Sequence, residues 1–303
     1  MAQALPEAIA LPDPPTDGVT SLSFLPPDIS DSLLVSSSWD GSVRIHDVAS
    51  MKLVACQAME SGSLLSLATP KGGAIFTGGL DGSVRRFDVS KSTTSIVGFH
   101  SEGEIPSNGN SKNACSCLSP LDKVSESDSV LASSGWDSNF YLWDVRAPGK
   151  PVSTIKLPGK AFSMDSVNGN RVVVNTAGRK TCIIDVRMSD GEVTADMVLN
   201  RESSLKYQTR VVRFFPDGKG MAVGSIEGRV AIEFLDELRV NSNGMKKYAF
   251  KCHRVGDIVY PVNTISFNSR YGTFATGGCD GTVVTWDGLN KKKLTTLPKF
   301  ATS

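Results

Sequence analysis

The residues best suited to chemistry are three cations in short stretches that begin, connect or end predicted strands. Arg210 ends KYQTR, Arg229 ends IEGR, and Lys251 lies within YAFKCHR, while Glu227 comes just before Arg229. Guanidinium and ammonium groups on a rigid sheet edge can bind a phosphorylated or acidic peptide through charge-assisted hydrogen bonds. The alternative interpretation is an ordinary solvated, charged rim. The elements that carry these residues decide whether their side chains meet.

No constellation for catalysis accompanies these cations. The chain has three histidines, His46, His100 and His253, and it lacks a G-x-S-x-G elbow, a P-loop and an H-E-x-x-H motif. His46 stands at a strand-closing position that Trp or Phe fills in other copies, which favours a core or hydrogen-bonded role over metal ligation. We therefore expect no enzymatic activity, no cofactor and no metal.

Composition narrows the class of protein further. The 303 residues are 40% hydrophobic, and 32 Lys plus Arg are balanced by 31 Asp plus Glu, so the chain lacks the basic excess of non-specific nucleic-acid binders. The sequence contains no apolar run of 18 residues, so it predicts no membrane-spanning helix. The six cysteines show no CxxC spacing, and we expect buried, reduced thiols in an intracellular protein.

One sequence frame repeats six times along the chain. Its copies read SSSWDGSVRIHDV, TGGLDGSVRRFDV, SSGWDSNFYLWDV, NTAGRKTCIIDV, GSIEGRVAIEF and TGGCDGTVVTWDG. The turn position falls at Asp40, Asp81, Asp137, Gly178, Glu227 and Asp280, at intervals of 41 to 56 residues, and polar inserts at 100–113 and 236–247 lengthen two of them. A period of this length with Trp-Asp dipeptides is typical of WD-type β-propeller blades.

Each copy predicts four short strands, with an Asp-Gly turn between the second and the third. We expect that turn to be type I′, in which both central residues have positive φ. The turn aspartates and the aspartates that close the third strands recur with the blade period. We therefore interpret them as structural rather than catalytic.

The repeats predict an all-β protein with a single WD40 propeller domain over residues 1–303. Blades are expected at 17–59, 62–99, 113–157, 161–200, 207–253 and 262–300, and residues 7–12 are a possible closing strand. Six repeats end near Phe300, so we expect a seven-bladed family fold whose seventh blade is truncated. The alternative is a six-bladed closure in which Glu7 to Leu11 join the blade of residues 262–300.

The fifth repeat departs from the common frame. It has Glu-Gly-Arg in the turn, and Phe234 replaces the aspartate that closes the third strand in most other copies. In a blade of four antiparallel strands, the entry to the first strand, the turn between the second and third, and the end of the fourth share one rim. We therefore expect Arg210, Arg229 and Lys251 to converge at one end of this blade, with Glu227 beside them.

Four local sequences resemble the family of mitotic checkpoint WD-repeat proteins known as Bub-three. They are RESSLKYQTR (201–210), SIEGRVAIEF (225–234), KKYAFKCHR (246–254) and the segment from YPVNTISF to ATGGCDG (260–281). The resemblance is specific from about residue 200 to 293 and looser, but collinear, from Asp17.

The resemblance implies a non-enzymatic adaptor whose propeller is monomeric and which works in the nucleus and at kinetochores in mitosis. Family members bind the GLEBS motif of the Bub checkpoint kinase and its relatives. They also read phosphorylated Met-Glu-Leu-Thr repeats on a kinetochore scaffold protein. No membrane and no direct nucleic-acid contact is expected.

The resemblance also assigns individual residues. It implies that Arg210, Arg229 and Lys251 lie near the phosphothreonine. It further implies that Trp39, Trp136, Glu227 and Arg229 lie along the face that holds the GLEBS segment. For the two tryptophans, a turn-packing role is the alternative.

The closest rival family is the messenger-RNA export WD protein of the Rae-one/Gle-two type, which also resembles SIEGRVAI and FKCHR and binds a GLEBS motif on a nucleoporin. SSLKYQTR and YAFKCHR favour the checkpoint family. A propeller hydrolase is a third possibility, and the absence of an acid, base and metal constellation argues against it.

Overall fold

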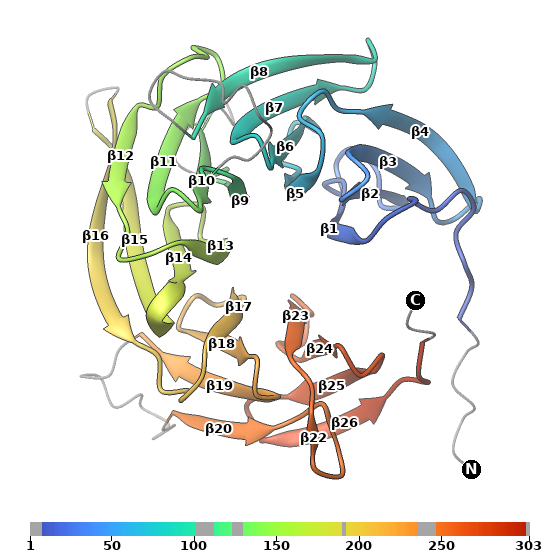
Figure 1. Cartoon of the computed structure of the whole chain (residues 1–303), viewed down its shortest axis with the longest axis vertical. Coiled ribbons are helices and arrows are strands. Elements are labelled where there is room, and N and C mark those ends of the chain that lie inside the picture. Colours follow the sequence, from blue (N-terminus) through green and yellow to red (C-terminus); the bar gives the residue numbers. More distant parts are fainter. Residues whose placement is uncertain (1–7, 101–111, 123–129, 190–191, 236–246, 301–303) are drawn as a thin grey trace. The chain divides into compact units, whose positions relative to one another are not determined.

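The computed structural model describes residues 8–100, 112–122, 130–189, 192–235 and 247–300. These residues form six four-stranded antiparallel sheets and one two-stranded sheet (Figure 1). The strands of each four-stranded sheet follow one another in chain order, as in propeller blades. The predicted all-β WD40 fold is confirmed, and the described residues contain no seventh four-stranded sheet.

The first three sheets, called blades one to three, come from residues 19–156. Blade one contains β1 (Val19–Phe24), β2 (Leu33–Ser38), β3 (Ser42–Asp47) and β4 (Lys52–Ala58). Blade two contains β5 (Leu64–Ala68), β6 (Ile75–Gly79), β7 (Ser83–Asp88) and β8 (Thr93–Phe99). Blade three contains β9 (Cys115–Pro120), β10 (Val130–Gly135), β11 (Asn139–Asp144) and β12 (Ser153–Lys156).

Blades four to six complete the set, and the short 3-10 segment η1 (Ala177–Arg179) lies in blade four. Blade four contains β13 (Ala161–Val167), β14 (Arg171–Thr176), β15 (Lys180–Ser189) and β16 (Glu192–Glu202). Blade five contains β17 (Thr209–Phe214), β18 (Gly220–Ser225), β19 (Arg229–Phe234) and β20 (Tyr248–Lys251). Blade six contains β23 (Val262–Phe267), β24 (Phe274–Gly278), β25 (Val283–Asp287) and β26 (Lys292–Thr296).

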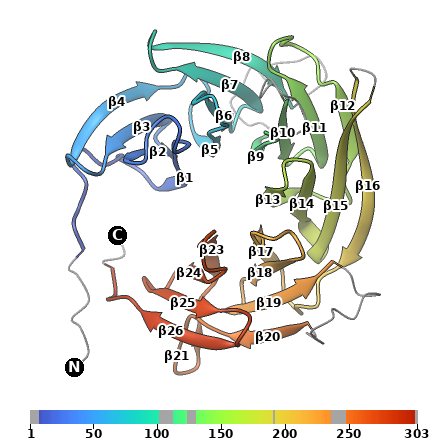
Figure 2. The ribbon, with the colours of Figure 1, turned by 180° about the vertical axis from the view of Figure 1, so that it is seen from behind.

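Between blades five and six, β21 (Arg254–Val255) and β22 (Ile258–Val259) form a small hairpin (Figures 1 and 2). The repeat pattern did not predict this hairpin, because it lies outside the common frame.

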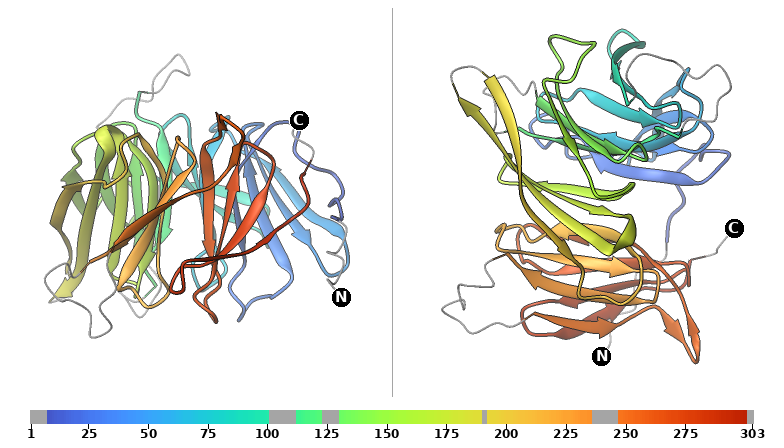
Figure 3. Two further views of the ribbon diagram at one scale, coloured as in Figure 1. Left: turned by 90° about the horizontal axis from the view of Figure 1, so that it is seen from below. Right: turned by 60° about the vertical axis from the view of Figure 1, so that its left-hand side comes forward.

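Contacts divide the chain into two compact units. Of the described residues, those within 9–162 and 184–197 form the N-terminal unit, and residue 8 with those within 163–183 and 198–300 forms the C-terminal unit. The second of these contains blades five and six, whose antiparallel strands are drawn in orange and red in Figure 3. In the described residues, no helix is long and apolar enough to cross a membrane.

The turns between the second and third strands differ from the predicted type I′ geometry. Gly41, Gly82 and Gly281 have φ of 81°, 84° and 73°, whereas the aspartate before each is not among the residues with positive φ. The Gly41 N–H donates to the Ser38 carbonyl at 3.1 Å. The positive φ is therefore confined to the last residue of the turn, as in a type I turn followed by a left-handed glycine. The turn aspartate therefore does not adopt the positive φ that a type I′ turn would require.

The turn aspartates are structural, as predicted. Asp40 accepts the backbone N–H of Ser42 at 2.9 Å, and Asp280 accepts that of Thr282 at 3.1 Å. Asp137 does the same for Asn139 at 3.1 Å. Each carboxylate thus satisfies a donor where the turn enters the third strand.

All three histidines are buried and hydrogen-bonded, as predicted for His46. His253 Nδ1 lies 2.9 Å from Asp280 Oδ1, and its Nε2 lies 2.8 Å from Thr276 Oγ1, which also accepts from Trp286 Nε1. The same arrangement joins His100 to Asp137 and Ser133, with Trp143 Nε1 donating to Ser133 Oγ. In each unit, a histidine after one blade is bonded to the turn of the next.

The third histidine, His46, contacts the segment that was predicted to form the closing strand. His46 Nε2 lies 2.8 Å from the Pro12 carbonyl oxygen, and residues 8–12 form no strand. The sheet of blade six contains only β23 to β26. The predicted strand at 7–12 is therefore not formed over residues 8–12, because this segment is bonded to a side chain of β3 instead of to a sheet edge. Glu7 lies outside the described residues, as do most of the two inserts.

The cysteines correct one expectation. All six are free, but only Cys115, Cys117, Cys182 and Cys252 are buried. Cys56 is exposed on the outer strand β4, and Cys279 is exposed at the turn position that Trp39 occupies in blade one. Strand alternation turns one side outward, and the turn position lies at a rim, so these two sulfurs face solvent.

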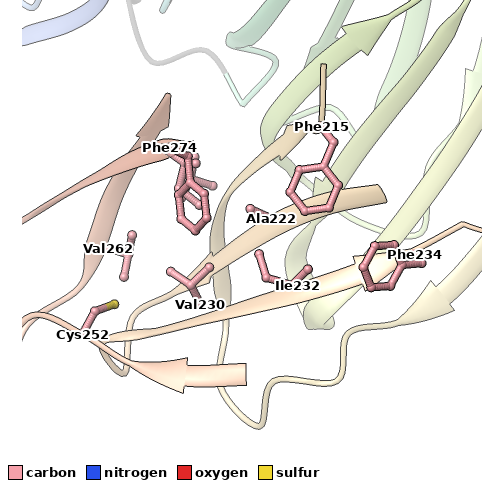
Figure 4. Close-up of a cluster of buried hydrophobic side chains, with 10 residues drawn as sticks. Phe215, Ala222, Val230, Ile232, Phe234, Cys252, Val262 and Phe274 are labelled. Carbon is pink, nitrogen blue, oxygen red and sulfur yellow. The ribbon is translucent and has the colours of Figure 1, made fainter. Parts of the chain in front are cut away.

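A core cluster shows why Phe234 replaces the closing aspartate in blade five. Val230, Ile232 and Phe234 alternate along β19 and pack with Phe215 and Phe274 in one buried cluster (Figure 4). The rings of Phe215 and Phe234 lie 6.0 Å apart between centroids. Phe234 thus adds apolar surface to the core of the C-terminal unit instead of capping a turn.

Candidate functional site

The candidate site lies at one end of blade five, where the strand register brings the predicted residues together in part. Arg229 begins β19 and is the direct Cα partner of Lys251, which ends β20. At the same end, Thr209 of β17 is the partner of Ser225 of β18. The next residue, Arg210, falls at an irregularity in this register, two strands away from Arg229.

Side-chain alternation places two of the cations on one face of the sheet. Directly opposed residues on antiparallel strands project their side chains to the same side, so Arg229 and Lys251 share a face. Val230, on the other side, packs in the cluster of Figure 4. Arg210 precedes Val211, which belongs to that same cluster, but it falls at the register irregularity, so strand alternation does not fix its side of the sheet.

The charges at this end of the blade are poorly neutralised. Arg229 Nε lies 3.6 Å from Glu227 Oε2, and the two side chains are 35% and 16% exposed. Arg210 and Lys251 are exposed and, within the described residues, form no ion pair. Counting the described residues alone, two cations without an ion pair and a third with one long acidic contact leave net positive charge at this end of the blade.

Gly228 gives this turn its shape. Its φ is 61°, and a Cβ at this position would lie 2.6 Å from the Cys252 carbonyl oxygen and 3.0 Å from that of Tyr260. The Gly228 carbonyl in turn accepts the N–H of Cys252 at 2.9 Å. The backbone can therefore approach the end of β20 closely only because residue 228 is glycine. This approach sets the positions of Glu227 and Arg229 on either side.

Arg254 is a residue of the site that the sequence interpretation missed. Its Nη2 donates to the backbone carbonyl of Glu227 at 2.8 Å, so the base of the small hairpin holds the turn. The available signal was a basic residue directly after the buried Cys252 and His253 in YAFKCHR. That position is adjacent to the end of β20, where contact with the turn is expected.

Buried groups beneath the turn are held in fixed protonation states. Burial raises the pKa of the Cys252 thiol to about 12, with a further rise from Asp280 and an opposing effect of Arg254. Burial also opposes ionisation of Asp280, but hydrogen bonds from Thr282 and His253 outweigh it and lower the pKa of that carboxyl. Asp280 is therefore ionised, and Cys252 is a neutral thiol at neutral pH.

The two predicted tryptophans lie in the N-terminal unit, at matching turn positions of blades one and three. Trp39 is 40% exposed, and its Cδ1 would lie 3.5 Å from a Cβ on Gly18. Trp136 is half-buried, with Lys160 Nζ 5.9 Å from the centroid of its ring. Both rings are partly accessible, as a binding role requires.

The arrangement at blade five can bind an anion but offers no reaction machinery. Within the described part of the chain, no group of three or more His, Cys, Asp or Glu side chains could hold a metal ion. Guanidinium and ammonium groups on a fixed sheet edge can donate several charge-assisted hydrogen bonds to one phosphate.

Comparison with known proteins agrees with the blade architecture. The family model of the WD domain, G-beta repeat, matches residues 10–47, 104–144 and 244–287. The chain is 42% identical over 302 residues to mitotic checkpoint protein BUB3.1 of Arabidopsis thaliana, covering 97% of this chain and 81% of the relative.

Two further relatives bear on the choice between families. Mitotic checkpoint protein bub3 of Dictyostelium discoideum is 38% identical over 296 residues, 96% of this chain and 81% of the relative. The poly(A)+ RNA export protein of Schizosaccharomyces pombe is 33% identical over 301 residues, 97% of this chain and 78% of the relative.

Proposed function

The chain belongs to the Bub-three family of WD-repeat mitotic checkpoint proteins, and we propose that it is a non-enzymatic adaptor that joins a GLEBS-bearing checkpoint kinase to a phosphorylated kinetochore scaffold protein. In this proposal it acts in the nucleus and, in mitosis, at kinetochores. Its phosphorylated ligand is a Met-Glu-Leu-Thr repeat.

The observation that carries this proposal is the uncompensated positive charge at the rim of blade five. Arg229 and Lys251 are opposed across β19 and β20, and Lys251 and Arg210 form no ion pair within the described residues. A phosphothreonine brings up to two negative charges and several acceptor oxygens. Arg229 and Lys251 would donate to these oxygens together, and Arg210 would contribute from β17.

The GLEBS segment is assigned to Trp39, Trp136, Glu227 and Arg229. The partly accessible rings of Trp39 and Trp136 suit the apolar side chains of such a segment. Glu227 has its backbone fixed by Arg254 and its carboxylate near Arg229, so it can accept hydrogen bonds without moving.

Calorimetric titration of a phosphorylated Met-Glu-Leu-Thr peptide, with the GLEBS segment of a Bub kinase already bound, tests the phosphopeptide assignment. We expect Arg229→Glu and Lys251→Glu each to weaken binding by roughly tenfold or more, because each removes a charge-assisted contact and adds repulsion. The unmodified protein should bind the unphosphorylated peptide weakly. Its affinity for that peptide should be no higher than the affinity of the two variants for the phosphopeptide.

Lys219→Glu is the matched control, because Lys219 is an exposed lysine at the opposite end of the same blade. It makes the same charge change and should leave the affinity within about twofold, since charge effects at that distance are screened. Equal losses in all three variants, or no loss in any, would show that the assigned residues do not form the phosphate site.

The export function is the second candidate, and it is favoured by the 33% identity to the poly(A)+ RNA export protein. Pull-downs with immobilised chain separate the two candidates. Capture of a checkpoint kinase supports the proposal, whereas capture of a nucleoporin with RNA, and no checkpoint kinase, would support the export function instead.

A further inference from the structure

A pocket of about 270 Å³ lies in the C-terminal unit, at the ends of the first strands of blades four, five and six. Its walls come from Asp165–Val167 of β13, from Arg213 to Pro216 at the end of β17, and from Ile265 to Phe267 with Ser269 at the end of β23. Arg210 lies near the beginning of β17, whereas this pocket lies at the other end of that strand. The pocket is therefore separate from the proposed phosphopeptide site.

The pocket contains one carboxylate and one guanidinium that do not pair with each other. Asp165 Oδ2 accepts the backbone N–H of Phe214 at 2.7 Å. Arg213 Nη1 donates to the Val212 carbonyl at 2.7 Å, and to Ser163 Oγ and the Met164 carbonyl at 3.3 Å. Both side chains are thus fixed by the backbone of rigid strands.

Both groups have hydrogen-bonding capacity left over. Within the described residues, Nε and Nη2 of Arg213 have no hydrogen-bond partner, so the guanidinium can donate to a ligand. Asp165 can accept further bonds, since a carboxylate offers about four acceptor positions. Burial raises the pKa of Asp165, while the charge of Arg213 and the N–H groups of Phe214 and Ser166 oppose that rise. Desolvated, titratable groups in a concave site are typical of binding sites.

We propose that this pocket binds the side-chain carboxamide of an asparagine or glutamine in a partner peptide. The carboxamide carbonyl accepts from Arg213, and its NH₂ group donates to Asp165. A neutral carboxamide can bond to both groups, whereas an ammonium would face Arg213 and a carboxylate would face Asp165. Aromatic walls suit the methylene stem, because Phe215 and Phe267 pack edge to face at 5.1 Å.

The size of the pocket supports a single side chain as the ligand. Sites for drug-sized molecules are generally about 300–1,000 Å³, and this pocket lies just below that range. A site of this size anchors one residue of a peptide and leaves the rest of the affinity to surrounding contacts.

The experiment is a titration of the full chain, with ¹³C-labelled methyl groups, by three peptides: acetyl-Gly-Gln-Gly-amide and its Glu and Lys counterparts. The methyl signals of Ile265 and Val167, which line the pocket, report occupancy. We expect saturable shifts with the Gln peptide and at least fivefold weaker binding of the other two. Equal binding of all three, or no saturable shift, overturns the proposal.

Variants place the binding in the pocket. Asp165→Asn and Arg213→Met should each weaken binding of the Gln peptide at least fivefold. Asp196→Asn, at an exposed aspartate of β16, should leave this binding unchanged. If these two substitutions unfold the chain, Ser266→Phe decides, because it fills the pocket from an exposed position and leaves Asp165 and Arg213 in place. Undiminished binding to Ser266→Phe overturns the proposal.

Discussion

Arg229 and Lys251 are direct Cα partners across β19 and β20, so two cations project from one face of an antiparallel pair. Like charges in directly opposed positions destabilise a sheet, by roughly 0.2–1 kcal/mol. Glu227 offsets this cost only in part, because its carboxylate lies 3.6 Å from Arg229 Nε. The arrangement is unfavourable for the isolated protein and favourable once an anion lies between the two side chains.

Lys251→Glu should therefore have opposite effects on stability and on binding. The new carboxylate faces Arg229, so the free energy of unfolding should rise by roughly 0.2–1 kcal/mol, while phosphopeptide affinity falls. Urea unfolding without ligand, alongside calorimetry, measures both. A variant that is less stable as well as unable to bind would indicate that Lys251 has a packing role instead.

Gly228→Ala should be more damaging than the same change at Gly256. Both glycines have φ near 60°, and holding alanine there costs about 1–2 kcal/mol. A Cβ on Gly256 meets nothing within 4 Å, whereas a Cβ on Gly228 lies 2.6 Å from the Cys252 carbonyl oxygen. Unfolding should show a clearly larger loss for Gly228→Ala, and phosphopeptide affinity should fall only in that variant. Equal losses would contradict the assigned role of the contact.

The period of the repeat was sufficient to predict six blades and the end of blade five at which Arg229 and Lys251 meet. Four-stranded antiparallel order follows from alternating hydrophobicity, and strand order alone fixes which strand ends share a rim. Even an irregular copy such as GSIEGRVAIEF keeps this order, because Val230, Ile232 and Phe234 still alternate into the core.

Features formed by residues outside the repeated sequence frame could not be predicted from the repeat. The β21–β22 hairpin and the contact of Arg254 with Glu227 depend on residues between two repeats, where no periodic signal exists. The turn type was wrong because Asp-Gly is compatible with more than one turn, and only the backbone distinguishes them. Cys279 was expected to be buried, although a turn position at a rim faces solvent.

Asp280→Asn should lower the free energy of unfolding at neutral pH and make it less dependent on pH in the acidic range. The pKa of Asp280 is lowered in the folded protein, below the unfolded value of about 3.9. Its stabilising effect is therefore complete above about pH 5 and is lost as the pH falls through the folded pKa. Asn cannot reproduce the charged bond to His253, so we expect a loss of about 1–3 kcal/mol at pH 7.

Urea unfolding at pH 7 and at pH 3.5 measures this effect. The unmodified chain should lose more stability between the two values than Asp280→Asn does, and Asp257→Asn, at an exposed aspartate of the small hairpin, should behave like the unmodified chain. Parallel losses for all three proteins would mean that other carboxylates dominate the acid response.

Thiol reactivity should separate the six cysteines into two groups. Cys56 and Cys279 are exposed, whereas burial raises the pKa of Cys182 to about 11 and that of Cys252 to about 12. Only the thiolate attacks an alkylating reagent, so buried thiols are inert. Brief treatment with iodoacetamide at pH 7.5 should give two adducts in the folded protein by mass spectrometry, and one in Cys279→Ser. Adducts at Cys252 before unfolding would contradict the burial of this sulfur.

Arg254 should act on binding through Glu227 rather than through the phosphate. Its Nη2 donates to the Glu227 carbonyl at 2.8 Å, so Arg254→Met releases the turn that carries Glu227 and Arg229. We expect the affinity for the GLEBS segment and for the phosphopeptide to fall severalfold. The free energy of unfolding should fall by roughly 1.5–3 kcal/mol, because a hydrogen bond from a charged group is lost. Arg254→Lys keeps a donor and should restore part of both. If Arg254 instead contacted the phosphate, Arg254→Met would reduce binding of the phosphorylated peptide alone and leave the GLEBS segment bound as tightly as before.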